Sequence, residues 1–443
     1  MSFIADTQTL DDLNLAGRYR PDSVFNLFNK VKTRGGEQLL FKMFHHPMSD
    51  ANQINARSAL LKFFSRQALV FPFSREQVND IDEYIAIHNG SFISTFLNIT
   101  GKKIAAVALR DDAYPALSKQ IKTTITLLKR FSHYLEQMNL GHEDHPFLLM
   151  LEEIKSKMST GNLKWIKSLP DENDISLFNV IRLDHLLRHT HTADMQNILT
   201  SIYELDVYIA VGNVAITKKF SFAKALPDGS IIDAENLRHP SIEKAVGNPV
   251  SMSNAANVLF LTGANMAGKS TLMKSFGIAV YLAHMGFPVA ADKMTFSVKD
   301  GIYSSINVPD DLSLGYSHFY AEVKRVRKVA EEICRPLRLV IIFDELFKGT
   351  NVKDAYDATL AITEAFSNQV ECLFIISTHI TEAGETLRQK GGPFQFVYFP
   401  SILENCKVPT YTYRLQHGIS NDRHGMMIIE NERILELIES GAN

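Results

Sequence analysis

Hydrophobic and polar positions follow a helical spacing over the first half of the chain. Apolar residues recur every three or four positions, as in VFNLF from Val24 and QLLFKMF from Gln38, and Pro47 ends this stretch. A period of 3.6 residues predicts amphipathic helices, and runs typical of strands are scarce here. We therefore predict a short N-terminal segment, residues 1–19, and an all-α domain over residues 20–217.

The pattern changes after about residue 218, where short apolar or β-branched runs alternate with helical stretches. These runs are FSFAKAL, GSIIDAE, NVLFLTG, RLVIIFDE and CLFIIST. Such alternation predicts an α/β domain with a largely parallel sheet over residues 218–443. In the tail, FQFVYFP and TYTYRLQHG are expected to add antiparallel strands, and NERILELIES is expected to form a short helix.

Length and composition agree with two or three soluble domains. A chain of 443 residues is too long for one ordinary core, and its 45% hydrophobic and 21% charged residues are typical of globular proteins. The formal net charge of −3 means that a nucleic-acid surface would have to be a local basic patch.

One such patch is present between residues 102 and 130. It holds Lys102, Lys103, Arg110, Lys119, Lys122, Lys129 and Arg130 against Asp111 and Asp112. The surplus could contact a phosphate backbone, but a solvated helix face is the simpler interpretation. No aromatic residues interleave with the charges in the way that stacking on single strands requires.

Cysteine usage and the N-terminus predict the compartment. Cys334, Cys372 and Cys406 show no CxxC spacing, which is typical of reduced thiols in a cytosolic protein. No stretch approaches the roughly 18 apolar residues of a membrane span, and the N-terminus lacks the features of a signal peptide. We expect a cytoplasmic protein with no membrane partner.

The stretch TGANMAGKSTLMK, residues 262–274, predicts a phosphate-binding loop. Gly263, Gly268, Lys269 and Ser270 match G-x-x-x-x-G-K-[ST] between a predicted strand and a predicted helix. The glycines let backbone N–H groups surround a phosphate at a helix N-terminus. Lys269 should reach the β- and γ-phosphates, the Ser270 hydroxyl should bind Mg²⁺, and Thr271 can donate to an inner phosphate. The expected ligands are ATP and Mg²⁺.

Two later strand ends carry further candidate groups. In RLVIIFDELFKGTN, five apolar residues precede Asp344 and Glu345, and His379 ends CLFIISTH. Asp344 should hold Mg²⁺ through Ser270 or water, and Glu345 is the candidate general base for an attacking water. His379 is a candidate γ-phosphate sensor. The simpler alternatives are a solvated acidic pair and an ordinary surface histidine.

Taken together, TGANMAGKST, DELFKGTN and STH resemble the ATPase domain of the MutS family, the ATPases of DNA mismatch repair and recombination. RHPSIEKAVGNPV resembles the approach to the family's nucleotide pocket, and PDDLSLGYSHFYAEV resembles its signature segment. The helical half resembles the family's lever domain, so that the resemblance spans roughly residues 20 to 435.

The resemblance implies an ABC-type P-loop ATPase that acts as a homodimer with composite sites, moves its lever with ATP, and binds DNA in repair or recombination. It places metal binding on Ser270 and Asp344, catalysis on Lys269, Glu345 and His379, and a contact to the partner's nucleotide on Ser317. Nucleotide contacts are implied for Gly263, Ala264, Asn265, Met266, Ala267, Gly268, Lys269, Ser270 and Thr271. The Asn265 amide can bridge the γ-phosphate to a partner subunit.

Several positions depart from the family pattern. Leu314-Gly315-Tyr316-Ser317 replaces Ser-Gly-Arg-Ser, Lys348 replaces an arginine, and Val250 replaces an aromatic residue that stacks on adenine. Only about 20 residues precede the lever region, so we expect no specific mismatch recognition. A nucleotide-gated scaffold with little turnover and no DNA binding stays an alternative. A P-loop kinase is disfavoured, because the acidic pair and His379 suit water attack.

Overall fold

The computed structural model describes residues 3–17, 20–86, 92–138, 145–169, 176–264, 266–306, 318–347, 350–404, 408–420 and Ile438. The chain forms two compact units. The α/β unit comprises Met1–Phe28, Met43–Lys62 and Val214–Asn443, and the helical unit comprises Asn29–Lys42 and Phe63–Asn213. Three of the four boundaries fall inside helices, namely α3 (Arg34–His45), α4 (Ala51–Gln67) and α11 (Thr192–Lys218).

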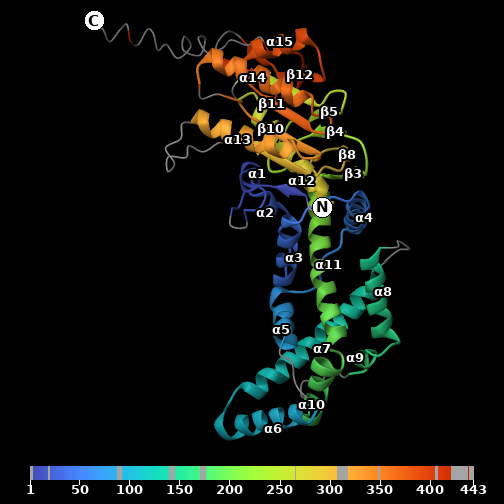
Figure 1. Ribbon diagram of the computed structural model, residues 1–443. Helices are drawn as coiled ribbons and strands as arrows, with labels where there is room; N and C mark the ends of the chain where they lie inside the picture. The colour runs from blue at the N-terminus through green and yellow to red at the C-terminus, as the bar shows by residue number, and fades with distance from the viewer. Residues whose placement is uncertain are drawn as a thin grey trace. The chain divides into compact units, whose positions relative to one another are not determined.

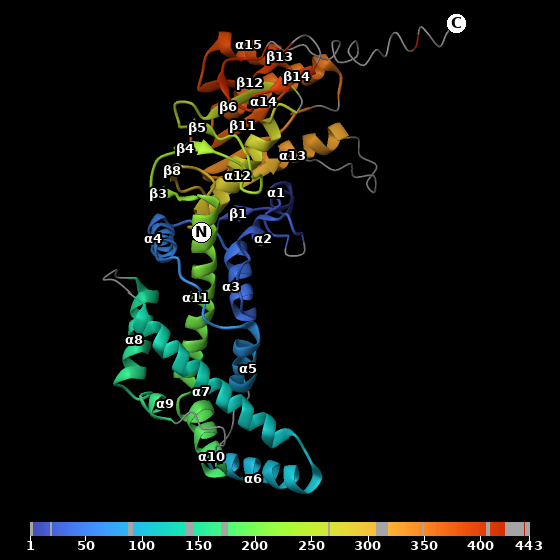
Figure 2. The same cartoon turned by 180° about the vertical axis from the view of Figure 1, so that it is seen from behind.

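The helical unit is organised around one long helix, α7. Besides its parts of α3, α4 and α11, this unit contains α5 (Arg75–Ala86), α6 (Phe92–Leu109), α7 (Ala113–Gln137), α8 (Pro146–Ser159), α9 (Trp165–Ser168), α10 (Leu177–His185) and the π-helix η1 (Leu186–Thr190). Apolar residues of α7, among them Ile121, Phe131 and Leu135, are fully buried at helical spacing. α5, α6 and α8 pack along α7 (Figure 2). The all-helical character predicted for this part of the chain is confirmed.

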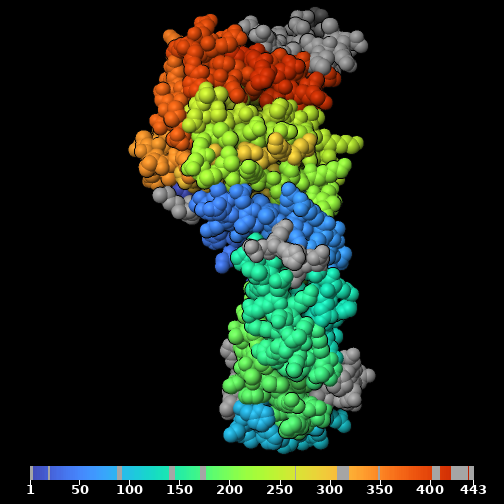
Figure 3. All heavy atoms as spheres, turned by 90° about the vertical axis from the view of Figure 1, so that its right-hand side faces the viewer, coloured from blue at the N-terminus to red at the C-terminus, as the bar shows by residue number. Residues whose placement is uncertain are grey.

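Two helices are long and apolar enough to cross a membrane, judged by length and composition alone. In α11, 78% of the apolar window is buried inside the protein, so α11 is a core helix. In α6 only 11% is buried, and Figure 3 shows its atoms, in cyan-blue, at the surface of the helical unit. The expectation that no stretch approaches the length and composition of a membrane span is therefore wrong for these two helices.

The α/β unit is built on a seven-stranded sheet in the order β1-β9-β10-β11-β6-β12-β15. The strands are β1 (Ile4–Ala5), β6 (Val258–Gly263), β9 (Gly301–Ser305), β10 (Leu339–Phe343), β11 (Leu373–Ser377), β12 (Phe394–Phe399) and β15 (Gln416–His417). All neighbours pair in parallel except β12 and β15. Every residue of β6, β9, β10 and β11 is buried, as expected for strands covered on both faces. The predicted parallel sheet is confirmed.

The prediction of antiparallel strands at FQFVYFP and TYTYRLQHG is confirmed for the pairing of β12 with β15 but is wrong for the pairing of β12 with β6. β12 pairs in parallel with β6, from Phe394 beside Val258 to Phe399 beside Gly263. The helix α15 (Thr381–Lys390) lies between β11 and β12 and provides the crossover that returns the chain in the same direction. Only the short β15 is antiparallel. The helix predicted in NERILELIES lies outside the described residues apart from Ile438.

Helices and smaller sheets surround the main sheet in this unit (Figure 1). The helices are α1 (Thr7–Asp12), α2 (Val24–Phe28), α12 (Lys269–His284), α13 (His318–Ile333), α14 (Val352–Ser367) and α15. A four-stranded sheet has the order β3 (Lys224–Leu226), β8 (Lys293–Ser297), β4 (Ile232–Leu237), β5 (Asn248–Met252). Two ribbons pair β2 (Ser221–Phe222) with β7 (Pro288–Val289) and β13 (Ser401–Glu404) with β14 (Val408–Tyr411).

The start of the chain belongs to this α/β unit. β1 adds a parallel strand to the edge of the sheet, with Ile4 beside Gly301 and Ala5 beside Ile302. Figures 1 and 2 both show α1, in dark blue, beside α13. The sequence gives this segment no pattern of its own, because its strand has only two residues.

Candidate functional site

The loop between β6 and α12 has the backbone that a phosphate-binding loop needs. Gly263 ends β6 at φ +129°, and a Cβ there would lie 3.0 Å from the carbonyl oxygen of Phe399. Gly268 precedes α12 at φ +111°. Both values are left-handed conformations that favour glycine, so the loop can curve tightly into the N-terminus of α12.

Lys269 is buried inside the curve of this loop. Its ammonium group donates hydrogen bonds to the carbonyl oxygens of Gly263, at 2.9 Å, and Ala264, at 3.1 Å. Ala267 is also buried, whereas Met266 is exposed at φ +65°. Asn265 lies outside the described residues. The lysine charge is therefore held at the mouth of the loop.

Ser270 and Asp344 meet where α12 begins and β10 ends. The Ser270 hydroxyl donates to Asp344 Oδ2 at 2.5 Å. Within the described chain, Asp344 Oδ1 is buried and accepts no hydrogen bond. Burial raises the pKa of Asp344, the Ser270 hydrogen bond opposes that rise, and the charge of Glu345 adds to it. A buried carboxylate oxygen beside a hydroxyl is a donor set that suits Mg²⁺.

Glu345 and His379 form a second pair beside the first. Glu345 Oε1 lies 2.7 Å from His379 Nε2, and both side chains are partly exposed. Glu345 adopts φ +51°, which is uncommon outside glycine and is typical of strained functional positions. β10 and β11 are neighbours in register, with Phe343 beside Ile376, which is why groups that follow their ends come together. The predicted site residues that the structure describes thus converge at one edge of the sheet.

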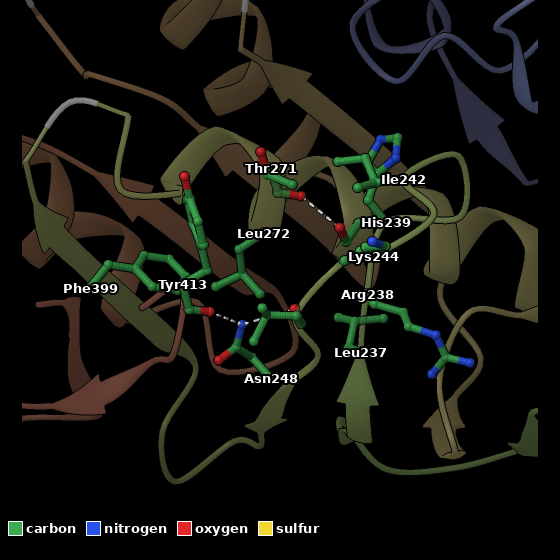
Figure 4. Close-up of a pocket in the computed structure, with 14 residues that line it drawn as sticks. Leu237, Arg238, His239, Ile242, Lys244, Asn248, Thr271, Leu272, Phe399 and Tyr413 are labelled. Carbon is green, nitrogen blue, oxygen red and sulfur yellow. Dashed lines mark hydrogen bonds between the residues drawn. The ribbon is translucent and has the colours of Figure 1, made fainter. Parts of the chain in front are cut away.

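A cavity of about 270 Å³ adjoins the loop (Figure 4). It is lined by Leu237, Arg238, His239, Ile242, Lys244, Ala245, Val246, Asn248, Gly268, Thr271, Leu272, Ser275, Phe399 and Tyr413. Eight of these residues come from the stretch RHPSIEKAVGNPV or its immediate flank, and four come from α12 and the residue before it. The lining combines apolar side chains with polar ones, among them His239, Asn248 and Thr271, as in sites for small ligands.

Asn248 secures one wall of this cavity. Its amide donates to the carbonyl oxygen of Tyr413 at 3.0 Å, and its Oδ1 accepts from the backbone N–H of Leu415 at 2.7 Å. Tyr413 is held at φ +55°. In Figure 4 Arg238 extends away from Tyr413, toward an ion pair with Asp292 at 3.1 Å. Burial lowers the pKa of His239, with the charge of Lys274 adding to the shift.

The aromatic residues of the cavity are ones that the sequence did not indicate. Phe399 ends β12, and Tyr413 lies between β14 and β15, far along the chain from the loop. Val250, at the position expected to face adenine, is buried in β5 beside Ala234 and does not line the cavity. Asn248, in the stretch RHPSIEKAVGNPV, is the residue of that stretch whose side chain contacts Tyr413. Ser317 and Lys348 lie outside the described residues.

Comparison with known proteins identifies relatives of this chain. Residues 259–441 match the family model described as MutS domain V. The chain is 25% identical over 361 residues to the DNA mismatch repair protein MutS of Pseudothermotoga lettingae. That alignment covers 80% of this chain and 42% of the relative, so the chain matches less than half the length of this curated protein.

Proposed function

Because this chain belongs to the MutS family, we propose that it binds and hydrolyses ATP and uses the cycle to rearrange a dimer and its lever on DNA, in repair or recombination. The observation that carries the proposal is the convergence of two pairs, Ser270 with Asp344 and Glu345 with His379, beside the buried Lys269. These are the groups that nucleotide hydrolysis requires.

The first pair suits a metal and the loop suits phosphates. Ser270 and Asp344 would hold Mg²⁺, which when bound neutralises charge on the β- and γ-phosphates. Lys269, already at the mouth of the loop, would exchange its two carbonyl partners for phosphate oxygens. The backbone N–H groups around Gly268 complete the anion site.

The second pair suits water attack. Glu345 lies next to the metal-binding position and is partly exposed, so it can orient a water and accept its proton. His379 contacts Glu345 at 2.7 Å and is the proposed γ-phosphate sensor. We propose that the adjoining cavity holds the nucleoside, with Phe399 and Tyr413 as aromatic walls.

The partners follow from family membership. We propose a homodimer, driven by ATP, in which Ser317 and Asn265 contact nucleotide across the interface, and DNA as the substrate surface, in the cytoplasm. Mispair specificity is not proposed. Measured affinity for a G·T mispair more than about tenfold above homoduplex, equivalent to about 1.4 kcal/mol, contradicts this part of the proposal.

Two substitutions separate binding from hydrolysis. Glu345→Gln keeps the size and one acceptor of the side chain but cannot take a proton. It should bind Mg·ATP, release phosphate about 10²-fold or more slowly than wild type, and accumulate as dimer. Lys269→Ala removes a phosphate contact, so it should lose ATP affinity and show no ATP-driven dimer.

Phosphate release and light scattering with Mg·ATP provide the measurements. Glu385→Gln is the matched control, because this glutamate pairs with Arg388 on the exposed surface of α15. Turnover of Glu345→Gln at the wild-type rate shows that Glu345 is not the base. Absence of turnover in the wild type under all conditions favours the nucleotide-gated scaffold instead.

A further inference from the structure

The segment formed by β1 and α1, residues 3–12, contributes three polar side chains to the interior of the α/β unit. Thr9 is fully buried and Asp12 nearly so, while Asp6 is partly buried. Polar groups are placed in a protein interior only when hydrogen bonds compensate for lost water. The partners of these three side chains lie on β9 and α13.

Asp12 and Thr9 hold the end of β9. Asp12 Oδ2 accepts hydrogen bonds from the Ser304 hydroxyl at 2.8 Å and from the backbone N–H of Ile306 at 2.9 Å. Thr9 Oγ1 accepts from the backbone N–H of Ser304 at 3.0 Å. Two backbone N–H groups and one hydroxyl at the end of this strand therefore depend on α1.

The residue between these two anchored positions contacts the candidate site directly. The carbonyl oxygen of Ser305 accepts from the backbone N–H of Asp344 at 2.9 Å. Asp344 is the residue that pairs with Ser270 at 2.5 Å. A displacement of the end of β9 would therefore be passed to the start of the acidic pair through one hydrogen bond.

Arg325 connects the same segment to α13. Its guanidinium forms an ion pair with Asp6, donates to the carbonyl oxygen of Ser304 through Nε at 3.1 Å, and reaches Thr9 Oγ1 at 3.2 Å. Lys328, one turn further along α13, donates to Asp6 at 2.7 Å. A planar guanidinium can bridge three acceptors in this way, whereas an ammonium cannot keep the same geometry.

The two anchored elements border residues 307–317, the stretch that contains Ser317. Ile306, which Asp12 holds, precedes this stretch, and α13, which Asp6 holds through Arg325, starts at His318 directly after it. Ile306 and α13 are thus both attached to one small segment at the start of the chain.

We propose that the β1–α1 segment is a positioning element of the ATP site, in which Asp6, Thr9 and Asp12 set the place of Asp344, of Ile306 and of α13. The expected effect on rate rests on the proposed ATP hydrolysis. The expected effect on local structure does not. The segment contacts no nucleotide, so its loss should misplace the reacting groups without removing a binding contact. Misplacement of this kind costs about ten- to a hundredfold in rate.

Asp12→Ala tests the proposal against Asp11→Ala. Asp11 is its neighbour on α1 and makes only a loose, exposed ion pair with Arg20 at 3.7 Å. Asp12→Ala should lower kcat at least about tenfold and leave KM for ATP within about twofold. Asp11→Ala should match wild type, and Asp12→Asn, which retains an oxygen acceptor, should recover part of the rate. Equal loss of kcat and ATP affinity in Asp12→Ala, or no change in kcat, overturns the proposal.

Hydrogen exchange of the nucleotide-free protein provides a readout that does not depend on turnover. Asp12→Ala should increase exchange at Ile306, Asp344 and the first turns of α13, with α12 and β6 unchanged. Uniform acceleration across the whole sheet indicates general destabilisation and contradicts a positioning role. If the wild type lacks ATPase activity, the proposed function fails, and this measurement still decides about the β1–α1 segment.

If Asp12→Ala does not fold, Arg325→Lys tests the same proposal. It keeps the charge beside Asp6 but loses the forked donors to Ser304 and Thr9. Local exchange should rise at Ile306 and at the start of α13, and kcat should fall at unchanged KM. Wild-type exchange and kcat in Arg325→Lys contradict the proposed attachment of α13.

Discussion

β10 and α6 are both strongly apolar, yet they place their side chains in opposite environments. All five residues of β10 are at most 2% exposed. In α6, Ile93, Leu97, Ile104 and Val107 are between 63% and 80% exposed, while the hydroxyl-bearing Thr95 is buried. Apolar composition alone therefore does not determine burial. What decides it is whether neighbouring elements cover both faces, as sheet neighbours and helices do for β10.

The difference also concerns function. Burial of β10 holds its end in place, and the two residues that follow, Asp344 and Glu345, emerge beside Ser270 and His379. Arg110, Asp111 and Asp112 follow α6, but all three are exposed, unlike the groups that follow β10. Its outer face consists of apolar side chains at helical spacing, and the described parts of the chain leave that face uncovered.

The largest effect is expected from a matched pair of isoleucine substitutions. Ile341→Ala in β10 creates a cavity and should lower the free energy of unfolding of the α/β unit by about 2–5 kcal/mol. Ile104→Ala in α6 removes an exposed side chain and should change that of the helical unit by less than about 0.5 kcal/mol. Urea unfolding, with the transition of each unit resolved, provides the values. Similar costs for both substitutions contradict the contrast between β10 and α6.

A pH-dependent effect on stability is expected at Asp6, which follows the edge strand β1 of the main sheet. Burial raises the pKa of Asp6, but hydrogen bonds from Arg325 and Lys328 more than offset this and hold it well below its usual range. A lowered folded pKa adds stability above the unfolded value of about 4, and this stability is lost as pH falls below it.

Asp6→Asn should therefore lower the free energy of unfolding by about 2 kcal/mol at pH 7. The difference from wild type should shrink as pH is lowered from about 4. Thermal unfolding of both proteins between pH 3 and pH 7 provides the comparison. A difference that stays constant with pH shows that the Asp6 charge does not stabilise this edge.

A smaller cost is expected at the loop that follows β6. Gly263→Ala introduces a Cβ at φ +129° and 3.0 Å from the carbonyl oxygen of Phe399. Strain of this kind costs about 1–3 kcal/mol. Gly391→Ala is the control, because its Cβ would meet no atom within 4 Å although φ is also positive, at +73°. Equal destabilisation by both substitutions would assign the cost to backbone conformation alone, without the contact to Phe399.

The smallest effect is a gain, expected on the buried side of α6. The hydroxyl of Thr95 is buried and has no hydrogen-bond partner among the described residues. Thr95→Val replaces it with a methyl group of the same shape and should raise the free energy of unfolding by up to about 1 kcal/mol. A rise in the unfolding temperature of the helical unit checks this. A loss of stability would show that the Thr95 hydroxyl forms a hydrogen bond in solution and that the buried face of α6 needs a polar group at this position.

The sequence by itself determined the features that a single short stretch of chain specifies through the spacing of its residues. The loop from Gly263 to Ser270 needs glycines, a lysine and a hydroxyl at fixed offsets between a strand and a helix. Asp344 and Glu345 directly follow an apolar run. Parallel strands place their carboxyl ends at one edge, so the meeting of Ser270 with Asp344 could be predicted without coordinates.

Only the tertiary structure decided features that depend on which elements become neighbours. Phe399 and Tyr413 reach the cavity because β12 pairs with β6 and because Asn248 holds the Tyr413 backbone. The α15 crossover sets the parallel direction of β12. β1 takes its place by pairing with the edge of β9 that faces away from β10. The exposure of α6 follows in the same way, because a helical pattern shows which residues share a face but not whether another element covers it.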